Sequence, residues 1–255
     1  MPTDASAVFL FAHQDDEFGV YALLDQYHRS GVRVRCAYLT DGAAAGVSAA
    51  TRNAESVAVL GQLGVAREDI VFAGELLAIA DAALPRHLGR AADWLRGWLG
   101  QPDSLHLPAW EGGHHDHDAL HAVAIELAFE LDLLERTTQF ALYHGARIAP
   151  PLFRTLSPLP ENGPVSRTRI SWAMRWRCLR YCLSYPSQLT TWLGLFPFAL
   201  WMIVVRGEQS LQAVSVERTL QRPHAGALYY ERRKFFTWQQ MQACLSAWRQ
   251  SVKPR

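Results

Sequence analysis

Short apolar segments alternate with helical patterns through the first 145 residues and constrain the fold more than any other feature. Strands are expected at 7–12, 32–39, 70–73, 104–108 and 140–144, and helices at 19–29, 50–63, 86–100 and 118–131. Alternation at this spacing predicts βαβ units around a mostly parallel sheet flanked by helices. Because the crossovers of such units are right-handed, the loops that follow the strands gather along one edge of the sheet. The predicted fold class is therefore α/β.

Three polar patches lie in loops that follow the expected strands. Residues 12–17 read Ala-His-Gln-Asp-Asp-Glu, residues 40–42 read Thr-Asp-Gly, and residues 112–118 read Gly-Gly-His-His-Asp-His-Asp. Open α/β sheets bind their ligands beyond the carboxyl ends of the strands, so we expect the patches to converge. Imidazole and carboxylate groups are ligands of zinc and neighbouring divalent metals. Together the patches predict the metal site of a hydrolase.

The first patch separates candidate metal ligands from a candidate base. His13 and Asp16 lie three residues apart in a strand-to-helix turn, so both can reach one ion. Asp15 lies between them and is left free for a general base, the role that a carboxylate serves beside a catalytic metal. Alternatively, Asp15 and Asp16 only cap a helix that begins near Glu17. Capping accounts for one acid but not for a second acid beside a histidine, so we favour the functional interpretation.

The second histidine patch holds more imidazoles than one ion can accept. We expect one of His114, His115 and His117 to be a ligand and another to be a proton donor or an oxyanion partner. His121 lies one helical turn after His117 and is expected to be structural, and Asp118 is expected to be a helix N-cap. A cluster of this kind can also be an adventitious metal-binding surface.

Length and composition leave room for one large α/β domain, or for one domain with an appendage. The chain has 255 residues, of which 49% are hydrophobic, and this argues against disorder. No basic segment followed by a long apolar stretch opens the sequence, so a signal peptide is not expected. The four cysteines are Cys36, Cys178, Cys182 and Cys244, and they form neither a CxxC pair nor a disulfide framework. We therefore expect a reducing, cytoplasmic setting.

The charge is divided unevenly along the chain. Residues 161–255 hold 14 Lys and Arg against 4 Asp and Glu, a net charge of +10, whereas residues 1–160 hold 11 against 20, or −9. This predicts a basic region that meets something anionic, such as nucleic acid, a membrane or a phosphorylated sugar. No nucleic-acid-binding motif accompanies the basic residues, so a nucleic acid partner is not expected.

Residues 167–205 combine basic, aromatic and apolar character. Residues 167–180 interleave five arginines with two tryptophans, and residues 192–205 form an apolar run of 14 residues that contains a proline. A spanning helix needs about 20 residues, so this run is too short to cross a membrane. It is either a buried strand or helix, or a segment that lies in a membrane interface. We favour burial, and contact of 167–205 with a membrane surface stays open.

Taken together, the motifs resemble those of the LmbE/PIG-L family of zinc-dependent N-deacetylases, which remove acetyl groups from N-acetylglucosamine-type sugars. Residues 12–17 match the family's Ala-His-Pro-Asp-Asp-Glu except at Gln14, and residues 114–117 match its His-Pro-Asp-His except at His115. Residues 40–42 fit its Thr-Asp-Gly, and Arg52 with Glu55 fits its Arg-x-x-Glu. The resemblance covers roughly residues 5–145. The loss of both prolines, which preset φ, predicts looser loops at the two patches.

The resemblance implies a Rossmann-like fold and one zinc ion on His13, Asp16 and His117. The uneven charge and the loop-like stretch at 156–164 place a boundary between a catalytic domain at 1–160 and a basic extension at 161–255, which we expect to pack on that domain and to shape substrate access.

The resemblance also implies roles for the remaining site residues. Asp15 is the base, and His114 polarises the carbonyl or protonates the amine. Asp116 tunes His114, and Arg52 holds the substrate. Trp110, just before the second histidine patch, is expected to be a further substrate contact.

The activity that follows is removal of acetyl from an N-acetylated amino sugar, for example a lipid-linked or surface-polysaccharide precursor at the inner face of a membrane. One alternative is a deacylase of a small thiol, a peptide or an antibiotic precursor. Another is a protein that binds sugar or lipid through an idle site. The complete set of candidate residues counts against an idle site, because such sites tend to lose a catalytic acid.

Overall fold

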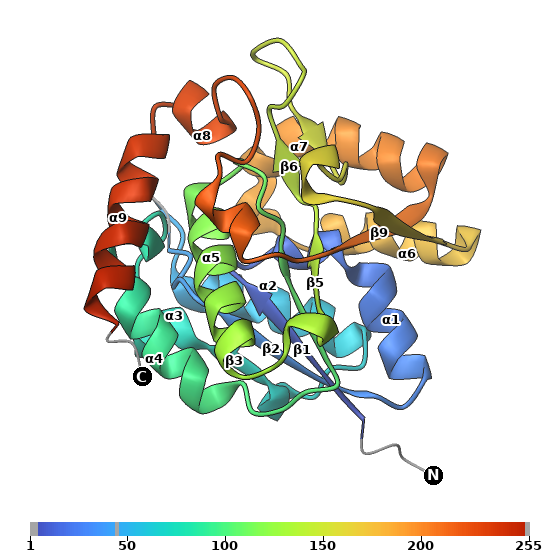
Figure 1. Ribbon diagram of the computed structural model, residues 1–255. Coiled ribbons are helices and arrows are strands. Elements are labelled where there is room, and N and C mark those ends of the chain that lie inside the picture. Colours follow the sequence, from blue (N-terminus) through green and yellow to red (C-terminus); the bar gives the residue numbers. More distant parts are fainter. Residues whose placement is uncertain (1–4, 44–45, 253–255) are drawn as a thin grey trace.

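A seven-stranded sheet with the order β3-β2-β1-β4-β5-β9-β8 forms the centre of the molecule (Figure 1). The computed structural model describes residues 5–43 and 46–252. The parallel strands are β1 (Ser6–Phe11), β2 (Arg33–Tyr38), β3 (Ile70–Phe72), β4 (Ser104–Pro108) and β5 (Thr137–Phe140). Two antiparallel strands, β9 (Glu208–Ala213) and β8 (Val165–Arg169), continue the sheet beyond β5. The predicted α/β class with a mostly parallel sheet is confirmed.

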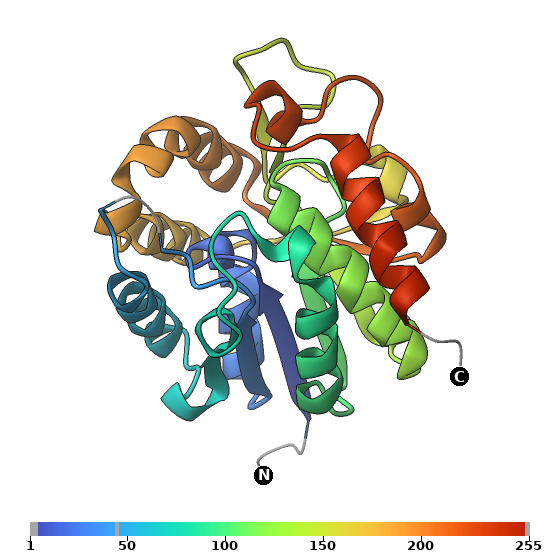
Figure 2. The same cartoon turned by 90° about the vertical axis from the view of Figure 1, so that its left-hand side faces the viewer.

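Helices cover both faces of the sheet (Figures 1 and 2). They are α1 (Tyr21–Arg29), α2 (Ala49–Gln62), α3 (Ala73–Leu76), α4 (Leu88–Trp98), α5 (His115–Glu130), α6 (Trp172–Cys182), α7 (Leu189–Trp201), α8 (Tyr229–Arg232) and α9 (Trp238–Ser251). Alternate residues of β1 point to opposite faces, as in any strand. Val8 and Leu10 therefore join a core with α4, α5 and α9, whereas Phe9 and Phe11 join a second core with α1, α2, α6 and α7.

The C-terminal part of the chain is built into the same sheet. β9 pairs with β5 through Thr138↔Ala213 and Gln139↔Gln212, and β8 pairs with β9 from Val165↔Gln212 onward. The sheet therefore runs across the division at residue 160. A small two-stranded sheet of β6 (Tyr143–His144) and β7 (Arg154–Thr155) projects beyond the main one.

The apolar run at 192–205 falls within a helix. α7 continues into the π-helical segment η7 (Met202–Arg206), and Pro197 lies inside α7. Leu195, Ala199 and Ile203 are buried, whereas Trp201 is 62% exposed, so only one side of the run lies in the core. No helix of residues 5–43 and 46–252 combines the length and apolar character needed to cross a membrane.

Candidate metal centre and active site

The first patch forms a tight turn directly after β1. The backbone N–H groups of Ala12 and His13 both donate to Asp16 Oδ2, each at 2.9 Å. Asp15 adopts a left-handed conformation with φ 105°, and its N–H donates to Glu17 Oε2 at 2.8 Å. A positive φ is uncommon for a residue other than glycine, so these contacts must hold the turn in place. Asp15 and Asp16 therefore do more than cap a helix.

The second histidine patch enters α5 through a glycine pair. Gly112 has φ 70°, and a Cβ on Gly113 would lie 2.0 Å from the carbonyl oxygen of Tyr143, so only glycine fits there. His114 is the N-cap of α5, because its Nδ1 accepts the N–H of Asp116 at 3.2 Å. The expected N-cap role of Asp118 is therefore wrong. Its Oδ1 lies inside the first turn and accepts two N–H groups of the 111–112 loop, at 3.2 and 3.1 Å.

His13, Asp16 and His117 converge on one buried point. His117 Nε2 lies 3.1 Å from His13 Nδ1 and 3.0 Å from Asp16 Oδ1, and His13 Nδ1 lies 3.8 Å from Asp16 Oδ2. Ligand atoms at zinc bond lengths of about 2.0–2.2 Å and tetrahedral angles are about 3.3 Å apart. Two imidazole nitrogens and a carboxylate oxygen at these separations fit a divalent metal ion.

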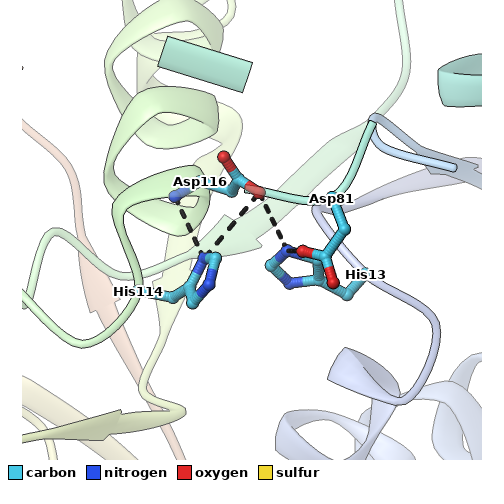
Figure 3. Close-up of side chains that lie close together, drawn as sticks. All are labelled: His13, Asp81, His114 and Asp116. Atoms are coloured by element: carbon cyan, nitrogen blue, oxygen red, sulfur yellow. Dashed lines mark hydrogen bonds and ion pairs between the residues drawn. The ribbon is translucent and has the colours of Figure 1, made fainter. Parts of the chain in front are cut away.

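A second group of side chains meets the other nitrogen of His13 (Figure 3). His13 Nε2 lies 3.0 Å from Asp116 Oδ2 and 3.1 Å from Asp81 Oδ1, and His114 completes a set close enough to hold a cation. However, Asp116 already accepts the N–H groups of Ala82 and Leu84 at 2.7 and 3.0 Å. A histidine that binds a metal must be neutral, so His13 in that state would donate from Nε2 to this anchored carboxylate and direct the Nδ1 lone pair toward Asp16 and His117. This is the usual outer contact of a metal-bound histidine, so we favour the first set.

Asp116 lies closer to His13 than to His114, the histidine that it was expected to tune. Its carboxylate bonds His13, whereas it lies 3.8 Å from His114 Nδ1. Burial alone would lower the pKa of His13, but the carboxylates of Asp81, Asp116 and Asp16 outweigh burial and hold that pKa well above its usual value. Asp116 also acts on His114, because its carboxylate raises the pKa of that ring against the larger effects of burial and His13. Its expected influence on His114 stays a prediction beside its bond to His13.

Asp15 lies beside the three candidate ligands and faces a buried arginine. Its side chain is 11% exposed, and Arg52 Nη2 lies 3.6 Å from its Oδ1. Burial raises the pKa of Asp15 to about 8, and the Arg52 guanidinium opposes that rise. A bound cation would also lower this pKa. Arg52 itself donates to the carbonyl oxygens of Gly42 and Gln14 at 2.5 and 2.6 Å, so it ties the first two patches together.

His114 presents a neutral ring to the pocket. Burial and the neighbouring His13 hold its pKa well below the usual value. Because Nδ1 accepts the N–H of Asp116, the neutral ring carries its proton on Nε2. An N–H donor at this position suits a carbonyl oxygen that gains negative charge during attack.

These side chains line an open pocket of about 490 Å³, open solvent included. Its lining consists of His13, Asp15, Asp16, Phe18, Arg52, Asp81, His114, His117, Tyr143, Gln188 and Leu195. Sequence reasoning missed five of these residues, namely Phe18, Asp81, Tyr143, Gln188 and Leu195. Phe18 directly follows the first patch, whereas none of the other four is next to a motif, and only the acidity of Asp81 signals a role. Gln188 and Leu195 belong to the C-terminal part of the chain and reach the site only through folding.

Trp110 is not a substrate contact. Its side chain is fully buried, its indole N–H donates to the carbonyl oxygen of Gln221 at 3.0 Å, and its ring packs on Trp238 with centroids 5.9 Å apart. His121 is structural as expected: it is buried and its Nδ1 lies 2.8 Å from the carbonyl oxygen of Pro108.

The two positions that depart from the family prolines are tied down by other contacts. Gln14 Nε2 donates to Asn53 Oδ1 at 2.5 Å and to the carbonyl oxygen of Asp41 at 3.2 Å. His115 stacks on Phe236 with centroids 4.8 Å apart, and its Nε2 lies 3.1 Å from the carbonyl oxygen of Ala82. Side-chain bonds and stacking replace the stiffness of proline, so the expected loosening does not follow from the two substitutions.

With this geometry in place, comparison with protein families identifies residues 8–128 as a PIG-L domain, described as GlcNAc-PI de-N-acetylase. The resemblance that the motifs predicted is therefore confirmed over residues 8–128. A search of curated proteins found no match.

Solved structures share the fold over most of the chain. A deacetylase of teicoplanin biosynthesis, in complex with bog, is 18% identical, covers 83% of this chain and 98% of its own, and has a TM-score of 0.64. The A40926 pseudoaglycone deacetylase is 18% identical with a TM-score of 0.63, and the match covers 88% of this chain and 100% of that one. N,N′-diacetylchitobiose deacetylase from Pyrococcus horikoshii is 18% identical with a TM-score of 0.59, over 86% and 87% of the two chains. At these identities the likeness shows a common fold.

Proposed function

We propose that the protein is a zinc-dependent deacetylase that removes the acetyl group from an N-acetylated amino sugar. One observation carries the proposal: His13, Asp16 and His117 converge on one point while Asp15 stands free beside them. Three ligands with an open position and a neighbouring carboxylate are the arrangement of catalytic, rather than structural, zinc sites.

The residues divide the reaction between them. Zinc, when bound to His13, Asp16 and His117, polarises the acetamide carbonyl and makes water a nucleophile near neutral pH. Asp15 takes the proton from the attacking water, and His114 Nε2–H donates to the carbonyl oxygen as charge develops on it. The C–N bond then breaks as Asp15 passes the proton to the leaving nitrogen. The products are acetate and the free amine.

Two buried charged side chains hold the proposed catalytic residues in position. Asp116 fixes the ring of His13, and Arg52 holds the turn that carries Asp15. Gln188 and Leu195 extend the pocket wall from the C-terminal region, which supports a role for residues 161–255 in substrate access.

A second candidate substrate is an acylated antibiotic precursor. Two structures that share the fold are described as deacetylases of the teicoplanin pathway and of the A40926 pseudoaglycone, and a third as a chitobiose deacetylase. Their substrates are all acetylated, and they support deacetylation rather than any one acceptor. The complete set of site residues disfavours an idle binding site.

The direct test is acetate release from a panel of N-acetylated sugars, nucleotide sugars, lipid-linked sugars and glycopeptides. Zinc content is measured on the same samples and zinc is titrated, because one structure of this fold is described as a zinc-inhibited form of teicoplanin deacetylase. Asp15→Asn should retain the metal and lose about 10²–10⁴-fold in turnover, the usual contribution of a general base. His13→Ala, as the matched control, should lose the metal. An Asp15→Asn enzyme within a few fold of wild type would assign the proton transfer to another group.

A further inference from the structure

The hairpin of α6, α7 and η7 carries large apolar side chains on its outer surface. On α6 the exposed fractions are 60% for Trp172 and 64% for Trp176, and Leu183, directly after α6, is 67% exposed. Trp201 at the end of α7 is 62% exposed, and Val205 in η7 is 52% exposed. Single exposed apolar residues are ordinary on a protein surface. Three exposed tryptophans on one hairpin are unusual, and exposed apolar clusters of this kind mark interaction sites.

Arg175 links the exposed side chains of α6 to the segment of α7 and η7. On α7 and η7 the exposed positions 194, 197, 200–201 and 205 recur every three to four residues, so they share one side of the helix. Arg175 joins this segment to α6: its guanidinium lies 4.3 Å from the centroid of the Trp172 ring and donates to the carbonyl oxygen of Val204 at 2.7 Å. Figure 2 shows the hairpin at the side of the molecule, apart from α4, α5 and α9.

The charge around this surface is mostly positive, with Glu208 Oε2 at 3.9 Å from Arg206 Nη2 as a neighbouring acid. Residues 162–207 contain six arginines and no Asp or Glu, and residues 181–205 contain no charged residue. Arg180 and Arg206 flank that uncharged stretch, and both are exposed. Arg175 and Arg177 are committed to the fold, because Arg177 Nη1 bonds Asp25 Oδ1 at 2.6 Å. An apolar surface rimmed by exposed cations complements an anionic lipid bilayer.

We propose that this face docks on an anionic lipid bilayer. Trp172, Trp176 and Trp201 would lie at headgroup level, where the indole combines an apolar ring with a polar N–H. Arg180 and Arg206 would meet lipid phosphates. The contact is interfacial, because α7 is a one-sided helix interrupted by Pro197 and is too short to span.

Docking would also place the active site next to the membrane. Leu195 lies on the buried side of α7 and lines the pocket, so the pocket wall and the bilayer contact are opposite sides of one helix. A helix with its side chains is about 10 Å across. We therefore expect the substrate to be an N-acetylated sugar on a lipid carrier. This second step rests on the proposed deacetylase function, whereas the docking itself does not.

Vesicle flotation measures docking without any activity assay. The full chain is mixed with vesicles of phosphatidylcholine alone or with 30% phosphatidylglycerol, at low and high salt. We expect flotation with the anionic vesicles that weakens as salt screens the arginines. Protein that stays unbound with anionic vesicles at low salt would overturn the proposal.

Matched variants locate the contact. Replacing Trp172, Trp176 and Trp201 together by Ser should weaken binding about ten-fold or more. Phe129→Ser with Leu220→Ser, which removes apolar residues 68% and 59% exposed elsewhere, should leave binding unchanged. Equal binding by both variants would place the contact outside this hairpin.

A second pair of variants isolates the charge. Arg180→Gln with Arg206→Gln should weaken binding to anionic vesicles about 30-fold. Arg86→Gln with Arg136→Gln, also exposed, should have no such effect.

Two further measurements separate the remaining explanations. A dimer in vesicle-free buffer that the Trp172, Trp176 and Trp201 variant dissolves would overturn docking and assign this face to a second copy. Wild-type and tryptophan variant should cleave a water-soluble acetylated sugar equally, and only the variant should fail on a lipid-linked one in vesicles. Normal flotation without any acetate release would refute the proposed function and leave the docking intact.

Discussion

Glu17 should determine the position of Asp15, the proposed catalytic base. Its side chain is fully buried and its two oxygens have different partners: Oε2 accepts the N–H of Asp15 at 2.8 Å, and Oε1 accepts the hydroxyl of Tyr38. Asp15 has φ 105°, so its position depends on contacts of this kind. Glu17→Gln keeps the shape of the side chain but supplies one acceptor for two donors. Glu17→Ala supplies none.

The loss in the free energy of unfolding can be worked out from the number of hydrogen-bond donors that each variant leaves without an acceptor. A buried donor that loses its acceptor costs about 1–3 kcal/mol. Glu17→Gln should therefore lower the free energy of unfolding by about 1–3 kcal/mol, and Glu17→Ala by about 2–6 kcal/mol before any cavity is counted. Total stabilities are about 5–15 kcal/mol, so the alanine variant approaches unfolding and the glutamine variant is the informative one.

Glu111→Gln is the matched control for stability. Glu111 is also fully buried and also serves two donors, but the N–H groups of Leu142 and Tyr143 both bond its Oε1, each at 2.8 Å. A glutamine can keep both bonds through Oε1, and its amide nitrogen takes the place of Oε2, which is already buried without a hydrogen-bond partner. Because both backbone donors keep their acceptor, this variant should lose less stability than Glu17→Gln.

The assay is urea unfolding of the three proteins at equal metal content, with kcat measured alongside. We expect Glu17→Gln to lose more than about ten-fold in kcat while retaining the metal, because Asp15 moves and the ligands do not. Equal stability of Glu17→Gln and Glu111→Gln, together with an unchanged kcat, would show that Glu17 does not hold Asp15.

Two further predictions concern histidines. His114→Ala should lower kcat about 10²-fold or more while the metal is retained. His115→Ala loses a stacked and hydrogen-bonded ring, so it should lower the free energy of unfolding by about 1–3 kcal/mol and leave kcat within a few fold. A larger fall in kcat for His115→Ala than for His114→Ala would mean that the catalytic position is His115. Burial lowers the pKa of His106 to about 3, so the folded state keeps this ring neutral while the unfolded state protonates it below about pH 6.5. The contribution of neutral His106 to the free energy of unfolding is therefore complete above pH 6.5 and falls as the pH drops from there toward 3. The free energy of unfolding measured by chemical denaturation should differ between pH 7 and pH 5, and His106→Gln should reduce that difference by about 2 kcal/mol. An unchanged difference in the variant would refute the assignment.

Four of the five expected strands and all four expected helices could be predicted because their periodicity is local. The expected strand at 140–144 is wrong: β5 is Thr137–Phe140, and Tyr143–His144 is β6 of the small sheet. The expected strand at 104–108 is β4 to the residue, and the expected helix at 50–63 is displaced by one residue from α2. The clustering of the first and third patches also follows from local signals, since each patch directly follows a strand of a parallel sheet.

Other parts of the site depend on packing between distant segments. Glu17 contacts Tyr38, and Gln188 and Leu195 reach the pocket from beyond residue 180, none of which has a local signature. Trp110 was predicted to contact the substrate, but the structure buries it away from the pocket. It stands close to a motif in sequence, but it lies two residues after β4 and points into the core, so proximity along the chain did not predict its orientation.

The position of the candidate centre follows from the topology of the sheet. β1 pairs with β2 on one side and with β4 on the other, so the chain reverses its direction of winding between β1 and β4. Loops that leave two such strands diverge to opposite faces and open a crevice, which is where open α/β sheets bind ligands. His13 follows β1 and His117 follows β4, which explains how residues 104 apart in sequence come within 3.1 Å of one another. The fold thus provides the crevice, the side chains at its two rims form the candidate metal set, and Gln188 and Leu195 complete the pocket wall from the C-terminal part of the chain.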